Sequence, residues 1–97
     1  MPNTSIKNWA TDDRPREKML LKGYSALSNA ELLAILINNG TKDKTAVDLA
    51  KELLHKVDED LQKLGALSIK EILKLQVKGV GEAKAISIAA ALELGLR

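Results

Sequence analysis

One short segment of the sequence combines residue types that could bind a ligand. It is Lys78-Gly79-Val80-Gly81, and Lys84 follows three residues later. Glycines leave backbone N–H groups uncovered, and the N–H groups that begin a helix have no partner within that helix. The helix dipole adds positive potential at the same place, so a phosphate is attracted there. The segment therefore predicts a phosphate-binding turn, with Lys78 and Lys84 adding positive charge around it.

Two familiar phosphate-binding loops do not fit this segment. A dinucleotide-binding loop needs a strand before its glycines and a third glycine after them. Here a helical pattern comes first, and Lys84 stands where the third glycine would be. The GxxxxGK[ST] string of a P-loop is absent from the sequence. A simpler alternative stays open, in which the segment is a tight turn between two helices and its glycines serve packing alone.

The composition excludes several other kinds of site. The 97 residues include no cysteine and one histidine, His55, so a thiolate nucleophile and a multi-histidine metal site are ruled out. Trp9 and Tyr24 are the only aromatic residues, too few for a platform on which bases stack. The longest uncharged run, residues 32–41, is shorter than the ~20 residues of a membrane span. The N-terminus also lacks the apolar core of a secretory signal. We therefore expect a cytoplasmic protein without membrane contact.

Helices must position the turn, because the pattern is helical throughout. Leu, Ile, Ala, Lys and Glu dominate, and Val and Thr are too scattered for strands. A Ser or Thr followed three residues later by an acid predicts helix starts at Ser28, Thr45 and Ser68. We expect an all-α bundle of five or six short helices, forming one domain over residues 1–97 with an irregular arm over residues 1–12. The last helix should run from Glu82 to about residue 94. The residues expected in one buried cluster are Ile72, Leu75, Val80, Ile86 and Ala89, with Ala85 and Leu92 also facing inward.

The two halves of the chain contain a candidate internal repeat. A shift of 39 positions, without a gap, places Leu33 on Ile72 and Gly40 on Gly79. The helical faces that follow also agree, but any two amphipathic helices can be slid into agreement, and that alternative stays open. The matched turn glycine favours a true repeat. We expect residues 29–54 and 68–93 to follow similar paths that diverge at the turn.

Three strings carry a resemblance to a known family: DDRPREKMLLKG at residues 12–23, ALSNAELLAILINNGTK at 26–42 and VKGVGEAKA at 77–85. The last resembles the helix-hairpin-helix motif, which binds the DNA backbone without reading the base sequence. Together the strings resemble the N-terminal domain of the RadC (UPF0758) family, bacterial proteins named for DNA repair. The resemblance implies a tandem helix-hairpin-helix arrangement, with a degenerate first unit over residues 29–57 and a second unit over residues 68–95. In the first unit, Lys42 takes the place of the second hairpin glycine.

The resemblance also implies which groups contact DNA. The amides of Gly79, Val80 and Gly81 would hold a phosphate, helped by Lys78 and Lys84. Such hairpins can hold K⁺ or Na⁺ when DNA is bound, and no other cofactor is expected. The backbone carbonyls that would match this cation site belong to Leu75, Val77 and Val80.

A basic cluster near the N-terminus, with Arg14 and Arg16, could reach a second phosphate. The alternative is that these residues form a solvated first helical turn. If this cluster and the hairpin turn share a face of the domain, that face is the basic one.

Family members also carry a C-terminal domain resembling a zinc-dependent JAB/MPN isopeptidase, whose paired histidines are absent from this sequence. We therefore expect residues 1–97 to be a fragment or a stand-alone module without enzymatic activity. The predicted function is sequence-independent binding to the DNA backbone in a protein associated with DNA repair. The alternative is a protein–protein interaction or dimerisation module that does not bind DNA, with the missing C-terminal domain as one candidate partner.

Overall fold

A computed structural model describes residues 14–97, and the irregular arm expected over residues 1–12 lies outside them. The described part of the chain is all-α, as expected, and contains no strand. Its helices, in chain order, are α1 (Arg14–Lys22), the 3-10 helix η3 (Tyr24–Ala26), α2 (Asn29–Ile37), α3 (Ala46–Lys56), α4 (Leu61–Gly65), α5 (Ile69–Lys74) and α6 (Glu82–Leu96).

The three predicted capping boxes are all present, and they determine where α2, α3 and α5 begin. At each start the Ser or Thr hydroxyl accepts the amide of the acid three residues later, and the acid accepts the amide of the capping residue. At α3, for example, Thr45 Oγ1 accepts from the Asp48 amide at 3.1 Å and Asp48 Oδ2 accepts from the Thr45 amide at 3.0 Å. Each such cap stabilises its helix by about 1 kcal/mol, so the sequence places these starts by local chemistry.

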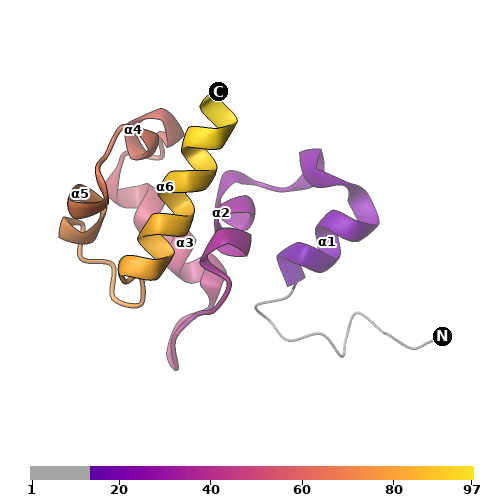
Figure 1. The fold of residues 1–97 in the computed structure, drawn as a ribbon. Helices are drawn as coiled ribbons and strands as arrows, with labels where there is room; N and C mark the ends of the chain where they lie inside the picture. Colours follow the sequence, from indigo (N-terminus) through magenta and orange to yellow (C-terminus); the bar gives the residue numbers. More distant parts are fainter. Residues whose placement is uncertain (1–13) are drawn as a thin grey trace.

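The core lies between two helix pairs, α2 with α3 and α5 with α6. In Figure 1, α6 passes in front of α3, with α2 on one side of it and α4 and α5 on the other. The large side chains that solvent does not reach come from α2, α3, α4, α5 and α6, and they include Ile37, Leu49, Leu53, Leu64, Ile72 and Ile88. One continuous cluster of buried apolar residues therefore joins the two pairs.

The inward face of α6 differs from the expected one at a single residue. Ile86 is 51% exposed, whereas Ile88 is fully buried. Ala85 is also fully buried, and Ala89 and Leu92 pack against the core. At 3.6 residues per turn, positions 85, 88, 89 and 92 share one stripe, and position 86 lies about 100° away from it. The expectation that Ile86 would be buried was therefore wrong, while Ile72, Leu75, Val80 and Ala89 do contribute to the core.

Helix α1 lies to one side of the bundle, next to α2, and gives the molecule an elongated outline of 44 × 32 × 21 Å. Two side chains of α1 reach α2. Lys18 Nζ lies 3.0 Å from a carboxylate oxygen of Glu31. The Arg16 guanidinium donates to the carbonyl oxygen of Ile35 at 3.2 Å and to Asn38 Oδ1. Polar contacts thus hold α1 against both ends of α2.

Candidate nucleic-acid interface

The predicted hairpin turn joins α5 to α6 and is anchored by Val80. The Val80 side chain is 8% exposed and belongs to the core, as expected for a residue that fixes the turn in place. Its amide donates to the carbonyl oxygen of Val77 at 2.9 Å. This internal bond uses the Val80 N–H group and the Val77 carbonyl, two of the groups that the resemblance implied for phosphate and cation contacts. The neighbouring Leu75 is half-buried against the core.

Gly79 is required by the local geometry. Its φ of +105° lies in a region that side chains disfavour. A Cβ at this position would also lie 2.5 Å from Thr41 Cγ2 and 3.1 Å from Leu49 Cδ1. Because Thr41 belongs to the turn between α2 and α3, the absence of a side chain at Gly79 lets the two interhelical turns touch.

Gly81 is not required by backbone conformation. Its φ is −91°, which any residue adopts, and a Cβ there would meet nothing within 4 Å. The local geometry therefore requires a glycine at Gly79 and not at Gly81. What Gly81 provides is open space in front of the first turn of α6.

That first turn of α6 begins without a side-chain cap. Gly81 is the N-cap residue, and the first backbone bond comes from the Ala85 amide to the Gly81 carbonyl oxygen at 2.9 Å. By contrast, a Ser, Thr or Asp side chain caps each of α2, α3, α4 and α5. Within residues 14–97, the amides of Gly81 to Lys84 thus have no hydrogen-bond acceptor, and the space around a Cβ at Gly81 is open. Uncapped N–H groups at a helix start attract anions.

The two predicted lysines of the turn are placed differently. Lys78 is exposed, and no carboxylate in the described chain forms an ion pair with it. Lys84 is half-buried, and its ammonium donates to the carbonyl oxygens of Asn39 at 2.7 Å and Gly79 at 3.0 Å. Lys78 is therefore available to a phosphate, whereas Lys84 is already bonded to both interhelical turns.

The turn between α2 and α3 lies beside the hairpin turn, but its polar backbone groups form hydrogen bonds within the turn itself. The Thr41 amide donates to the Lys44 carbonyl at 2.7 Å, and a Cβ on Gly40 would overlap that carbonyl oxygen. The capping box supplies acceptors for the amides of Thr45 and Asp48 at the start of α3. Those amides therefore have acceptors within the chain, which gives a physical reason to regard the first unit as degenerate for phosphate binding. Lys42 is exposed on this turn.

The two arginines of α1 also differ in placement. Arg14 is exposed at the start of α1, whereas Arg16 reaches the end of α2 through Asn38. Lys84 bonds to the next residue, Asn39. The start of α1 and the hairpin turn therefore flank the same segment, the C-terminal end of α2, which is the arrangement expected if they contribute to one basic face.

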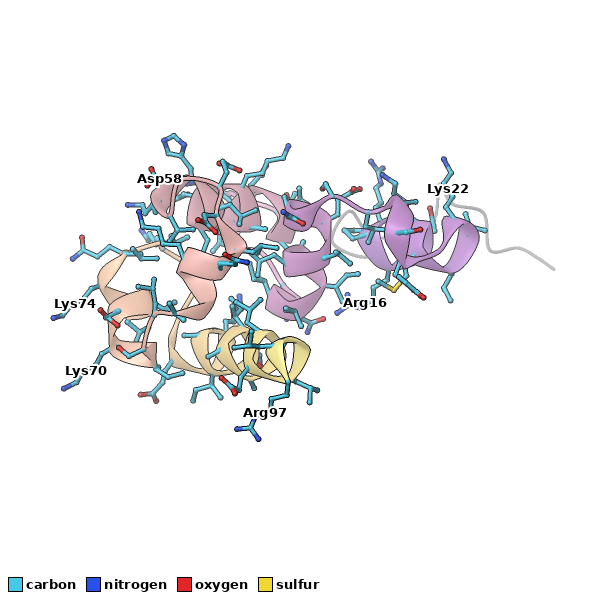
Figure 2. The ribbon with its side chains drawn as sticks, turned by 90° about the horizontal axis from the view of Figure 1, so that it is seen from above. Arg16, Lys22, Asp58, Lys70, Lys74 and Arg97 are labelled. Atoms are coloured by element: carbon cyan, nitrogen blue, oxygen red, sulfur yellow. The ribbon has the colours of Figure 1, made fainter. Side chains whose placement is uncertain are left out.

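Two lysines that the sequence reasoning missed extend the basic surface along α5. Lys70 and Lys74 are exposed and project together from α5 in Figure 2, at the end of the molecule opposite α1. With Lys78 they recur every four residues from α5 into the hairpin turn. This spacing was the signal that could have identified them.

No group of three or more His, Asp or Glu side chains able to hold a metal occurs in the described residues, and no helix among them has the length and apolar character to cross a membrane.

Comparisons with known proteins agree on one family. The family model described as UPF0758 N-terminal matches residues 6–86. A UPF0758 protein of Alkaliphilus oremlandii is 55% identical over 93 residues, and one of Flavobacterium johnsoniae is 50% identical over the same length. Each alignment covers 96% of this chain and 39% of the relative. A UPF0758 protein of Trichlorobacter lovleyi is 48% identical over 99 residues, which is 100% of this chain and 42% of the relative. The chain thus spans about two fifths of the length of these relatives, and no solved structure matches it.

Proposed function

The chain belongs to the UPF0758 family through its N-terminal domain, and we propose that this domain binds the DNA backbone without reading the base sequence. The observation that carries the proposal is the start of α6. Its first amides have no cap in the described chain, and a glycine with nothing within 4 Å of its Cβ position stands in front of them.

A phosphate oxygen at this place would accept hydrogen bonds from the amides of Gly81 and the first residues of α6. The partial positive charge of the helix start favours the anion by about 0.3–1 kcal/mol. Lys78 adds a full charge next to the turn, and Lys70 and Lys74 continue the positive surface along α5. All of these groups attract or bind phosphate, and phosphate contacts position a protein on DNA without specifying sequence.

The start of α1 supplies a candidate second contact. Arg14 is exposed, and Arg16 lies against the end of α2, next to the segment that Lys84 contacts. We propose Arg14 as the group that reaches a second phosphate, because Arg16 donates hydrogen bonds to Ile35 and Asn38. In this proposal the domain has no catalytic role, and because bacterial DNA lies in the cytoplasm, the domain acts there.

A direct binding measurement tests the proposal. Fluorescence anisotropy with labelled duplex, single-stranded and branched DNA should show weak binding to duplexes of unrelated sequence. Two or three phosphate contacts predict that the binding constant falls with salt at a log–log slope of roughly −2 to −3. Preference for branched over intact duplex DNA would support the association with repair that the RadC resemblance implies.

The Gly81→Asp variant tests the position of the site. An aspartate at the N-cap would accept hydrogen bonds from the α6 amides and would repel phosphate, so DNA binding should be lost. The domain should stay folded, because nothing obstructs a side chain at Gly81. Gly95→Asp is the matched control, because it makes the same change at an equally open position near the other end of α6. Wild-type affinity in Gly81→Asp would show that the hairpin is a structural turn only.

A protein-interaction module is the second candidate, and one surface favours it. An apolar groove of about 430 Å³ lies between α4 and the end of α6, with Leu61, Gly65, Leu92 and Leu96 among its lining residues. Leu94 and Leu96 at the end of α6 are strongly exposed. This alternative predicts no DNA binding even at low salt, together with self-association that a Leu96→Ser change abolishes in sedimentation measurements.

A further inference from the structure

Lys84 donates hydrogen bonds to both interhelical turns, the one between α2 and α3 and the hairpin turn between α5 and α6. Its ammonium donates to the carbonyl oxygen of Asn39, just after α2, at 2.7 Å. It also donates to the carbonyl oxygen of Gly79, in the hairpin turn, at 3.0 Å. Because Lys84 itself lies in the first turn of α6, one side chain connects both turns to the start of that helix.

The bonding of Lys84 differs from that of the paired lysines elsewhere in the described chain. Lys18, Lys44 and Lys63 each lie against a carboxylate, in ion pairs at the surface. The two acceptors of Lys84 are backbone carbonyls, whose positions are fixed by the turns themselves. An ammonium carries three donors, so a single lysine can hold two carbonyls from segments that are far apart in sequence.

The packing around Gly79 shows that the two turns are close enough for this role. A Cβ added at Gly79 would lie 2.5 Å from Thr41 Cγ2, which is too close for a side chain. The two turns are therefore in direct contact, with no side chain of Gly79 between them. Lys84 therefore spans an existing contact between the turns.

We propose that Lys84 is a positioning residue: its ammonium holds the two turns together and thereby fixes the uncapped amides of α6, without contacting phosphate itself. Its effect on DNA rests on the proposed function, whereas its effect on the turns does not. Two of the three ammonium donors are engaged by the carbonyls, and in this proposal the third does not contact phosphate. Removal of Lys84 should therefore disturb geometry and leave the number of ionic contacts unchanged.

The Lys84→Met variant tests this proposal, because it keeps the length of the side chain and removes its donors. Loss of the two charge-assisted bonds should lower the Tm by about 4–8 °C. Amide hydrogen exchange should accelerate at Thr41, which bonds to Lys44, and at Val80, which bonds to Val77, one amide in each turn. The Leu32 amide, bonded to Ser28 at the start of α2, is the internal reference that should stay protected. Lys84→Arg keeps the charge and the donors, and it should restore part of the Tm and part of the protection.

DNA binding distinguishes positioning from direct contact. Lys84→Met should weaken binding several-fold while the log–log salt slope stays at the wild-type value. Lys78→Met should make the slope shallower by about one and leave the Tm unchanged. A shallower slope in Lys84→Met with unchanged Tm and exchange would overturn the proposal and make Lys84 a phosphate contact. If no variant and no wild-type protein binds DNA, the proposed function fails, and the Tm and exchange data still decide the role of Lys84.

Discussion

Gly79 lies where the two interhelical turns touch, and both its backbone and its surroundings require a glycine. The positive φ disfavours any side chain, and Thr41 and Leu49 occupy the space that a Cβ would need. Gly81, two residues later, satisfies neither condition. A change at Gly79 therefore tests the fold, whereas a change at Gly81 tests the surface in front of α6.

Gly79→Ala should destabilise the domain. A non-glycine residue held in an unfavourable region of φ costs about 1–3 kcal/mol, and the overlap with Thr41 adds to that cost. We expect the free energy of unfolding in urea to fall by roughly 2 kcal/mol or more. Gly81→Ala is the control and should change it by less than about 0.5 kcal/mol, as is usual for surface substitutions. Equal stability of the two variants would contradict the turn-to-turn contact at Gly79.

At this scale the sequence identified the residue types of the hairpin but not their partners. The need for glycine at Gly79 and the burial of Val80 follow from the local pattern. The position of Thr41 against Gly79, and the bonds of Lys84 to Asn39 and Gly79, depend on two turns meeting in three dimensions. A lysine after a glycine turn was therefore interpreted as a phosphate contact, and its two bonds to backbone carbonyls could not be foreseen from that pattern.

Capping boxes mark the starts of three helices, and their acids make those helices sensitive to pH. The Ser68 amide, which donates to the Glu71 carboxylate at 2.8 Å, lowers the pKa of Glu71 below its usual 4.5. The Thr45 amide lowers the pKa of Asp48 below its usual 3.8 in the same way. At α2, the Ser28 amide, followed by Lys18, lowers the pKa of Glu31.

We expect the domain to lose stability in acid. A carboxyl whose pKa is lower in the folded state contributes stability that is complete above its unfolded pKa and is lost as the pH falls through its folded pKa. For these acids the loss should begin near pH 4.5 and continue below pH 3.8. Thermal unfolding at a series of pH values checks this expectation. Glu71→Gln keeps an oxygen acceptor for the Ser68 amide without titrating, so it should show a smaller decrease in Tm between pH 7 and pH 3 than the wild type.

Helix starts were predictable from the sequence because a cap is a contact between residues three positions apart. The buried face of α6 was less predictable from the sequence. Its stripe of Ala, Ile and Leu is nearly continuous, and the correct choice between Ile86 and Ile88 depends on the position of α2 against α6. The expected similarity of residues 29–54 and 68–93 stays a prediction. The 39-residue shift places Ala46, the first residue of α3, on Ala85, whereas α6 already begins at Glu82. The two units should therefore diverge at their turns.

Under the proposed function, the distribution of lysines over the whole molecule predicts the direction of the DNA footprint. Lys70, Lys74 and Lys78 extend from α5 into the hairpin turn, whereas Lys51 and Lys56 lie on the middle and the far end of α3. The Lys70→Glu/Lys74→Glu double variant should therefore weaken DNA binding at least tenfold at low salt and make the salt slope shallower by up to about two. Lys51→Glu/Lys56→Glu changes the net charge by the same amount and is the control.

The comparison between these two double variants separates a local footprint from a general effect of net charge. Equal losses of affinity would indicate that only the overall charge matters and that α5 is not part of the interface. A formal net charge of +2 gave no indication of such a surface, because it averages over the whole sequence. The all-α class was predictable from composition and helical periodicity, but the meeting of the hairpin turn and the start of α1 at the end of α2 was not.

The contact between the two turns also has a consequence for the order of folding. Within each helix pair the helices are joined by a short turn, so their contacts close small loops and can form early. The bond from Lys84 to Asn39 joins residues 45 positions apart, so it can form only after both pairs have docked. We therefore expect the interface in front of α6 to be completed late in folding and to open early in partial unfolding. Under the proposed function, a nascent or partly unfolded chain would then be unable to hold DNA, although most of its helices had already formed.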